Sequence, residues 1–249
     1  QDGARELRLL NSLEEKKELL RSLGVDRVEV LDFTRSFAAL TAEQYLREIL
    51  RDRYGVTTLL MGYDNRLGSD RLTADTLKPI AEGIGMELKE LLPLSFRPSE
   101  ASGEISSTQI RTALENGDIV SAAEMLGYGY SLKGVVVAGN RLGRTIGFPT
   151  ANMKLYEPLK LVPGRGVYAV EAEVLGKKYR GMTNIGLRPT VGGSFTTIET
   201  HILDFDEDIY GLPLRITFLR RLRDEVHFPS LEALKDQLEK DRDCCREQK

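Results

Sequence analysis

Apolar residues in the first half of the chain follow two spacings, one typical of helices and one typical of buried strands. A repeat of three or four positions predicts helices at residues 12–23, 41–50, 76–85, 107–116 and 119–126. Short apolar runs predict strands at residues 28–33, 56–61 and 86–92. Because these strands and helices alternate along the chain, the pattern predicts an α/β domain built on a parallel sheet.

After Gly127 the pattern changes to β-branched runs that are separated by glycine and proline. These runs predict strands at residues 132–137, 166–174, 177–185, 196–203 and 214–220. Closely spaced strands of this kind favour a compact antiparallel barrel or sandwich. The chain closes with an amphipathic helix over residues 230–246, for which Ser230 is the predicted N-cap. We therefore expect two domains, at residues 1–127 and 128–249.

The composition is that of a globular protein, and it narrows the classes of partner. The 249 residues are 41% hydrophobic and 29% charged, and 35 basic against 38 acidic residues give a formal net charge of −3. Because this balance offers no basic footprint for phosphates, we expect no nucleic-acid partner. No apolar run approaches the roughly 20 residues that span a bilayer, so we expect no membrane partner. The adjacent Cys244 and Cys245 indicate a reducing cytoplasm, and the oligomeric state stays open.

The segment 143–152 carries the first candidate chemistry of the chain. Gly143 and Gly147 permit a close approach of the backbone that side chains would block. Thr150 and Asn152 lie two residues apart, so in an extended segment both side chains point to the same side. Their oxygens are of the kind that Mg²⁺ prefers. The alternative is a turn in which these two side chains bond their own backbone.

Further along the chain, the carboxylate of Glu199 interrupts an otherwise apolar strand. A general base has to lie within hydrogen-bond reach of the hydroxyl that it activates, and an isolated carboxylate suits that role. The alternative is an exposed glutamate on the wet face of the strand. His201 shares a face with Glu199, and we expect it to be structural. Together with segment 143–152 these residues indicate a small-molecule kinase that needs no Walker A lysine loop, and the sequence contains none.

Seven ordered segments of the second half resemble the riboflavin kinase module: 132–136, 143–152, 163–168, 184–190, 199–205, 208–211 and 222–228. The resemblance implies a six-stranded Greek-key barrel with a C-terminal helix. It also implies ATP-dependent phosphorylation of the riboflavin 5′-hydroxyl, which yields FMN.

The same resemblance implies a role for individual residues. Thr150 and Asn152 are expected to ligate Mg²⁺, and Glu199 is expected to be the base on the ribityl hydroxyl. The expected ATP-binding residues are Arg141, Gly147, Phe148, Pro149, Thr150, Asn152 and Asn184. The expected flavin-binding residues are Arg223, Glu225 and Phe228.

Four segments of the first half, 9–16, 33–45, 61–68 and 105–111, resemble the FMN adenylyltransferase module of bifunctional bacterial FAD synthases. The implied fold is a Rossmann-like nucleotidylyltransferase domain with a parallel sheet. The candidate site residues are Gly62, Asp64, Asn65, Ser106, Ser107, Thr108 and Arg111. The hydroxyls precede a predicted helix, whose free N–H groups suit an anion, although an ordinary N-cap would use the same residues.

The first half also departs from that family. The HxGH signature cannot be present because no histidine precedes His201, and the chain begins at Gln1. Asn65 and Leu67 stand where the family has an aromatic residue or histidine and a phenylalanine. We therefore expect an incomplete sheet that lacks its first strand, in a parent protein that makes both FMN and FAD while this chain performs only the kinase step. The alternatives are a kinase with a degenerate first domain and a flavin-binding barrel without catalysis.

Overall fold

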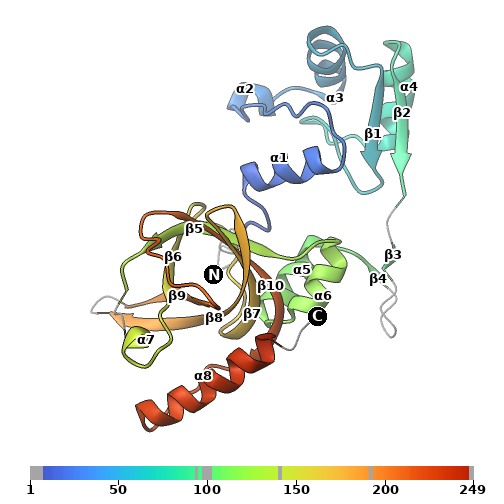
Figure 1. Cartoon of the computed structure of the whole chain (residues 1–249). Helices are drawn as coiled ribbons and strands as arrows, with labels where there is room; N and C mark the ends of the chain where they lie inside the picture. Colours follow the sequence, from blue (N-terminus) through green and yellow to red (C-terminus); the bar gives the residue numbers. More distant parts are fainter. Residues whose placement is uncertain (1–7, 93–94, 97–102, 140–141, 191–192, 247–249) are drawn as a thin grey trace. The chain divides into compact units, whose positions relative to one another are not determined.

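A computed structural model describes residues 8–92, 95–96, 103–139, 142–190 and 193–246 (Figure 1). The chain forms two compact units, of which one is Leu20–Ile105. The other combines the flanking segments Gln1–Leu19 and Ser106–Lys249. These units differ from the expected domains 1–127 and 128–249, since the segments on both sides of Leu20–Ile105 join the barrel. The domain boundaries therefore stay a prediction.

The unit Leu20–Ile105 is an α/β structure around a short parallel sheet. Strands β1 (Thr58–Gly62) and β2 (Glu87–Leu91) pair in parallel, as the pattern predicts. Its other elements are α2 (Arg35–Ala38), α3 (Ala42–Gln44), the π-helix η1 (Tyr45–Arg53), α4 (Ala74–Gly83), β3 (Ser95–Phe96) and β4 (Gly103–Glu104). Helix α4 covers the sheet, and the core contains Leu46, Met61, Leu77 and Leu88.

The predicted strand at 28–33 is wrong. The structure assigns no strand to these residues, although they are apolar enough to suggest one. Val30 is 49% exposed and Phe33 is 80% exposed. A strand needs a neighbour for its backbone hydrogen bonds, and among the described residues none pairs with this segment.

The second unit contains a closed six-stranded barrel, which confirms the expected fold. Its strands are β5 (Ser131–Val137), β6 (Ala151–Leu155), β7 (Gly166–Val174), β8 (Lys177–Thr190), β9 (Gly193–Ile202) and β10 (Pro213–Arg223). The order around the barrel is β10-β5-β6-β9-β8-β7, so β6 pairs with β9 and not with β7, as in a Greek key. The apolar pattern predicts five of these strands and misses β6.

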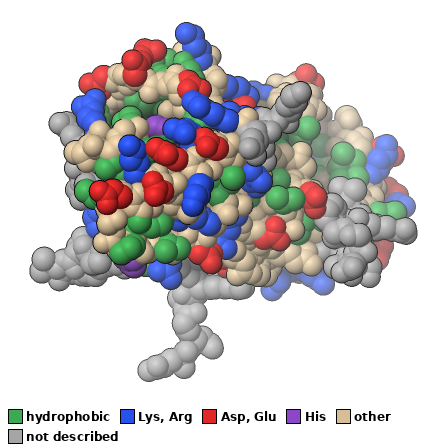
Figure 2. All heavy atoms as spheres, turned by 60° about the horizontal axis from the view of Figure 1, so that its bottom comes forward, with side chains coloured by type: hydrophobic (Ala, Val, Ile, Leu, Met, Phe, Trp, Pro, Cys, Tyr) green, Lys and Arg blue, Asp and Glu red, His purple; other side chains and the backbone are tan. Residues whose placement is uncertain are grey.

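Helices cover part of the barrel wall. Among the described residues of the barrel interior, Thr183 and Thr200 place their buried hydroxyls 2.8 Å apart. Helix α8 (Leu231–Arg246) packs on the outside, where an apolar cluster forms from Phe148, Val167, Ala169, Met182, Leu203 and Cys245. Figure 2 shows acidic and basic side chains interspersed over the visible face of the molecule.

Residues 8–19 pack on the barrel through backbone bonds and one buried ion pair. Leu9 exchanges backbone hydrogen bonds with Leu159 and Leu161, at 2.8 and 2.9 Å. In helix α1 (Leu13–Ser22), Glu15 pairs with Lys160 at 2.6 Å, and the two side chains are only 8% and 4% exposed. The Lys160 ammonium also donates to the Leu10 carbonyl at 2.6 Å. Helices α5 (Ser107–Glu115) and α6 (Ile119–Leu126) belong to the same unit, which explains its discontinuous sequence.

Replacement of Lys160 by methionine tests whether this pair anchors the segment. The single variant leaves the Glu15 carboxylate buried without its partner, so we expect a loss of about 3–5 kcal/mol in the free energy of unfolding. Lys178→Met is the matched control because Lys178 is exposed and its partner Glu171 is half-buried on the barrel surface, and we expect little change in stability. Urea unfolding measures both, and equal effects of the two variants would contradict the anchoring role.

Candidate active site

A row of three polar residues crosses neighbouring strands of the barrel wall. Asn152 on β6 lies opposite Glu199 on β9, and Glu199 lies opposite Asn184 on β8. Direct partners in antiparallel strands place their side chains on the same face. The flanking residues Ala151 and Thr200 are buried, so the row faces outward from the barrel. Residues from distant parts of the sequence thus meet at one place.

Thr150 stands at the end of this row, immediately before β6. Its hydroxyl donates to Oε2 of Glu199 at 3.4 Å. The other carboxylate oxygen, Oε1, faces Nη2 of Arg188 at 3.5 Å. Asn152 lies close over the backbone of Gly139, where an added Cβ would be 2.2 Å from the Asn152 amide nitrogen. Glycine at 139 therefore leaves the space that the Asn152 side chain occupies.

The glycines of segment 143–150 shape the loop that precedes Thr150. The Phe148 amide donates to the Gly143 carbonyl at 2.8 Å, which closes the loop after α7 (Leu142–Thr145). An added Cβ at Gly143 would lie 2.1 Å from the Phe148 oxygen, so only glycine fits there. Gly147 has φ of 85°, a left-handed conformation that favours glycine. The expected close backbone approach is therefore present at Gly143, whereas an added Cβ at Gly147 would meet nothing within 4 Å. The loop places Phe148 in the apolar cluster under α8.

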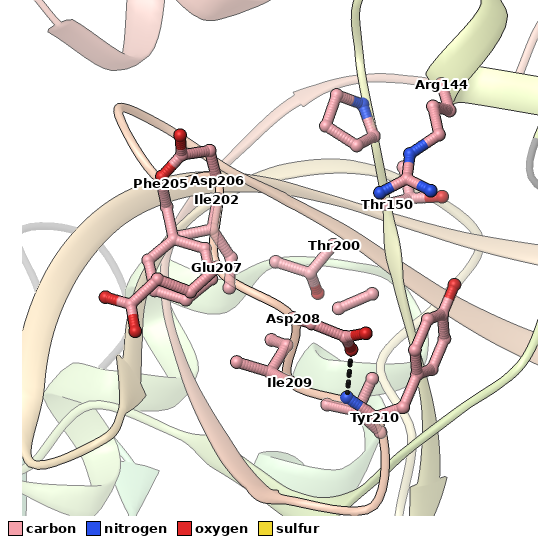
Figure 3. A pocket seen from close by; sticks show the side chains of 13 residues that line it. Arg144, Thr150, Thr200, Ile202, Phe205, Asp206, Glu207, Asp208, Ile209 and Tyr210 are labelled. Atoms are coloured by element: carbon pink, nitrogen blue, oxygen red, sulfur yellow. Dashed lines mark hydrogen bonds between the residues drawn. The ribbon is translucent and has the colours of Figure 1, made fainter.

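Two cavities adjoin Thr150. The first, here called the loop cavity, has a volume of about 270 Å³ and lies under residues 205–210 (Figure 3). Figure 3 shows Arg144 beside Thr150 on one side of the cavity. The acidic residues Asp206–Asp208, here called the acidic turn, lie on the other side. Asp208 in that turn accepts a hydrogen bond from the Tyr210 amide at 3.1 Å. The remaining walls are formed by Val136, Pro149, Ala151, Thr200, Ile202 and Ile209.

The second cavity, here called the helix cavity, has a volume of about 600 Å³ and lies between the outer barrel wall and α8. Glu199 and Asn184 line it together with Thr150, and Thr150 is the described residue that the two cavities share. Its apolar walls are Ile146, Phe148, Val167, Met182, Val226, Phe228, Leu231, Leu234 and Leu238. The helix cavity therefore combines a wide apolar surface with a small polar end.

Arg223 lines the helix cavity, but its charge is already paired. Nη2 of Arg223 lies 2.8 Å from the buried Asp241 carboxylate on α8. The guanidinium also stacks on Phe228, 5.5 Å from the ring centroid. Glu225 packs closely over Gly186, where an added Cβ would be 2.3 Å from its carboxylate. Arg223 thus holds the cavity wall to α8. Glu225 lines the cavity, and its carboxylate lies next to the backbone of Gly186.

The structure brings most of the expected kinase residues together. The helix cavity contains Phe148, Thr150, Asn184, Glu199, Arg223, Glu225 and Phe228, and the loop cavity contains Pro149 and Thr150. Asn152 joins them through the cross-strand row, Gly147 lies in the adjoining loop, and Arg141 lies outside the described residues. Sequence reasoning missed the acidic turn at 206–208 and the wall residue Met182. The signal for the turn was the run Asp206-Glu207-Asp208 before Tyr210-Gly211.

The adenylyltransferase candidates are divided between the two compact units. Gly62 ends β1, and the Asn65 amide donates to its carbonyl at 3.0 Å. Asp64 lies within that turn. Ser106 caps α5 in a reciprocal capping box with Gln109, with Ser107 and Thr108 in the first turn. Nε of Arg111 donates to the Arg8 carbonyl at 3.0 Å. An ordinary N-cap is therefore present at the start of α5.

Both halves of the sequence match families of known proteins. A family model described as riboflavin kinase matches residues 126–249, and one described as FAD synthetase matches residues 1–109. The bifunctional riboflavin kinase/FMN adenylyltransferase of Escherichia coli K12 is 39% identical over 239 residues, covering 96% of this chain and 75% of the relative. The chain belongs to the bifunctional riboflavin kinase/FMN adenylyltransferase family. The Bacillus subtilis relative of the same name is 36% identical and covers 94% of this chain and 73% of its own length.

A solved structure from Streptococcus pneumoniae, named a macrolide-efflux protein, is also similar. It has 34% sequence identity and a TM-score of 0.87, and the match covers 96% of this chain and 76% of that one. None of the helices described for this chain has the length and hydrophobicity of a membrane-spanning helix. The family matches support riboflavin phosphorylation and FMN adenylylation, with ATP and flavins as substrates.

The thiol of Cys245 reports how firmly the C-terminal end of α8 packs on the barrel. Burial in the apolar cluster raises the pKa of Cys245 to about 11. At pH 8 only about one thiol in a thousand is then ionised, and the thiolate is the reactive form. We expect iodoacetamide to modify Cys245 in a Cys244→Ser variant at least about 100-fold more slowly than Cys244 in a Cys245→Ser variant. Similar rates in the folded proteins would show that α8 is not closed on the barrel.

Proposed function

We propose that the loop cavity binds ATP and the helix cavity binds riboflavin, and that the phosphoryl group passes between them beside Thr150. The observation that carries this proposal is the place of Thr150 on the wall of both cavities. The larger cavity has the apolar surface that an isoalloxazine ring needs, and its polar end holds Glu199. The smaller one has apolar walls for an adenine ring and Arg144 for phosphate charge.

The reaction is the transfer of the terminal phosphoryl group of ATP to the 5′-hydroxyl of riboflavin. The hydroxyl oxygen forms a bond to the γ-phosphorus, and the bond from that phosphorus to the β–γ bridging oxygen breaks, which releases ADP. Glu199 accepts the hydroxyl proton. Arg188, 3.5 Å from Oε1, orients the carboxylate. The protein contributes mainly by positioning the two substrates, as is usual for phosphoryl transfer.

The donor set beside Glu199 fits Mg²⁺. Thr150 and Asn152 offer neutral oxygens, and Glu199 lies 3.4 Å from the Thr150 hydroxyl. Mg²⁺ favours such ligands and usually completes its shell with water and substrate phosphates. Among the described residues, no group of three or more histidine, cysteine, aspartate or glutamate side chains could hold a metal. Thr150 and Asn152 would therefore hold the ion together with ATP, and the ion would neutralise phosphate charge.

Adenylylation of FMN belongs to the first half of the chain. The turn Gly62–Asn65 follows the carboxyl end of the parallel strand β1, which is the end at which α/β sheets bind ligands. Asp64 and Asn65 are the polar groups of this turn, and Ser106 to Arg111 form the second candidate segment. We place both reactions in the reducing cytoplasm, since Cys244 and Cys245 are free thiols in the structure.

Replacement of Glu199 by glutamine tests its role as the base. The amide keeps the shape of the side chain but cannot accept the proton, so we expect kcat for FMN formation to fall about 10²–10⁴-fold. The dissociation constant of riboflavin, measured by flavin fluorescence, should stay within about threefold because the apolar walls are unchanged. Glu171→Gln is the matched control, since Glu171 pairs with Lys178 on the surface of β7. Unchanged kcat in Glu199→Gln would refute the assignment.

Replacement of Gly139 by alanine tests the placement of Asn152 without altering Asn152 itself. The new methyl group would lie 2.2 Å from the amide nitrogen, so the Asn152 side chain must move. We expect kcat to fall at least about tenfold, because a displacement of the Asn152 side chain by about 1 Å would misplace the bound ion and ATP. Gly83→Ala, where an added Cβ meets nothing within 4 Å, is the control for a glycine replacement. Normal FMN formation by Gly139→Ala would show that the position of Asn152 does not matter.

A further inference from the structure

His201 contacts the loop that precedes Thr150, and the proposed reaction assigns no role to these contacts. It lies on β9 two residues after Glu199, and both side chains line the helix cavity. Its Nδ1 atom lies 2.8 Å from the carbonyl oxygen of Pro149. Because a carbonyl oxygen can only accept, Nδ1 must carry the proton of this hydrogen bond.

The acceptor of this bond is the peptide group that begins Thr150. The Pro149 carbonyl carbon is bonded to the Thr150 nitrogen, so a fixed Pro149 oxygen fixes the plane from which Thr150 extends. The His201 ring also meets the Phe148 ring edge-on, with 5.1 Å between centroids. Phe148 is buried, whereas the preceding Gly147 has no side chain to hold the loop. His201 therefore contacts the loop on both residues that precede Thr150.

We propose that His201 is a positioning residue for phosphoryl transfer, because it ties the peptide before Thr150 to the strand that carries Glu199. Thr150 and Glu199 approach each other at 3.4 Å from a loop and from a strand, and His201 sets their separation. This inference rests on the proposed roles of Thr150 and Glu199.

The protonation state of His201 suits this task. Burial lowers the pKa of the imidazole, and Arg242 and Arg246 lower it further, against the Pro149 bond and Asp204. The ring is therefore neutral near neutral pH, with its proton on Nδ1. A neutral ring adds no charge beside the reacting groups.

Three substitutions separate the hydrogen bond from the bulk of the ring. His201→Ala removes the donor, and we expect kcat to fall about 10- to 100-fold through misplacement of Thr150. His201→Asn carries an amide N–H near the position of Nδ1, and we expect kcat within about threefold of the unsubstituted enzyme. His201→Gln carries its amide one bond further out and should resemble alanine. Equal loss in the asparagine and alanine variants would overturn the proposal.

A double-mutant cycle with Thr150→Ala tests whether His201 acts through Thr150. If it does, His201→Ala should lower kcat less than about twofold in the Thr150→Ala background, because the residue to be positioned is gone. Multiplicative losses would overturn the positioning role and leave the proposed function intact. Full activity of Thr150→Ala alone would instead defeat the proposed role of Thr150.

The tautomer of His201 gives a readout that is independent of activity. The chain has two histidines, His201 and His227, so ¹⁵N-labelled imidazoles can be assigned with the His201→Asn variant. We expect the neutral His201 ring to carry its proton on Nδ1. A proton on Nε2 would exclude the bond to Pro149 and with it the proposal.

Discussion

The pairing of β6 with β9 is the contact on which the site depends. Two register pairs, Ala151 with Thr200 and Asn152 with Glu199, join these strands. The sequence separation between them is long, so loop closure opposes their meeting, and the closed barrel supplies the compensating hydrogen bonds and apolar burial. Without this pair the barrel would be open at β6, and Asn152 would have no carboxylate beside it.

Because side chains alternate along β9, the residues on its inner face line one cavity and those on its outer face line the other. Thr200 and Ile202 face inward and line the loop cavity, whereas Glu199 and His201 face outward and line the helix cavity. A shift of one residue in the register would exchange these faces and place the carboxylate in the apolar interior. The buried pair of Thr183 and Thr200 hydroxyls satisfies the polar atoms that this register places inside. Two substrates can therefore be held on opposite sides of β9, with Thr150, immediately before the neighbouring strand β6, on the wall of both cavities.

Local patterns predicted much of this arrangement. Glycine spacing indicated the close backbone approach at Gly143. The two-residue spacing of Thr150 and Asn152 predicted that both side chains point to one side, and in the structure each lies beside Glu199. The strand β6 itself was missed because its five residues, with Asn152 and Lys154 among them, lack a clear β-branched run. The run at 28–33 misled for the opposite reason, since apolar residues without a partner strand do not form a sheet.

Contacts between distant segments could not be predicted in this way. Nothing in the local sequence says that Asp241 pairs with Arg223, that Glu15 is buried against Lys160, or that His201 binds the Pro149 carbonyl. Each depends on the closed barrel, and each changes the interpretation of a residue. Arg223 holds α8 to the barrel through its ion pair with Asp241. Residues 8–19 belong to the same compact unit as the barrel.

A crystal structure of the chain with ADP and riboflavin bound would test most directly which substrate each of the two cavities binds. We expect ADP in the loop cavity and the isoalloxazine ring in the helix cavity, with the terminal phosphate of ADP and the ribityl 5′-hydroxyl converging on Thr150 and Glu199. Both ligands on one side of β9, or a ribityl chain directed away from Glu199, would contradict this assignment.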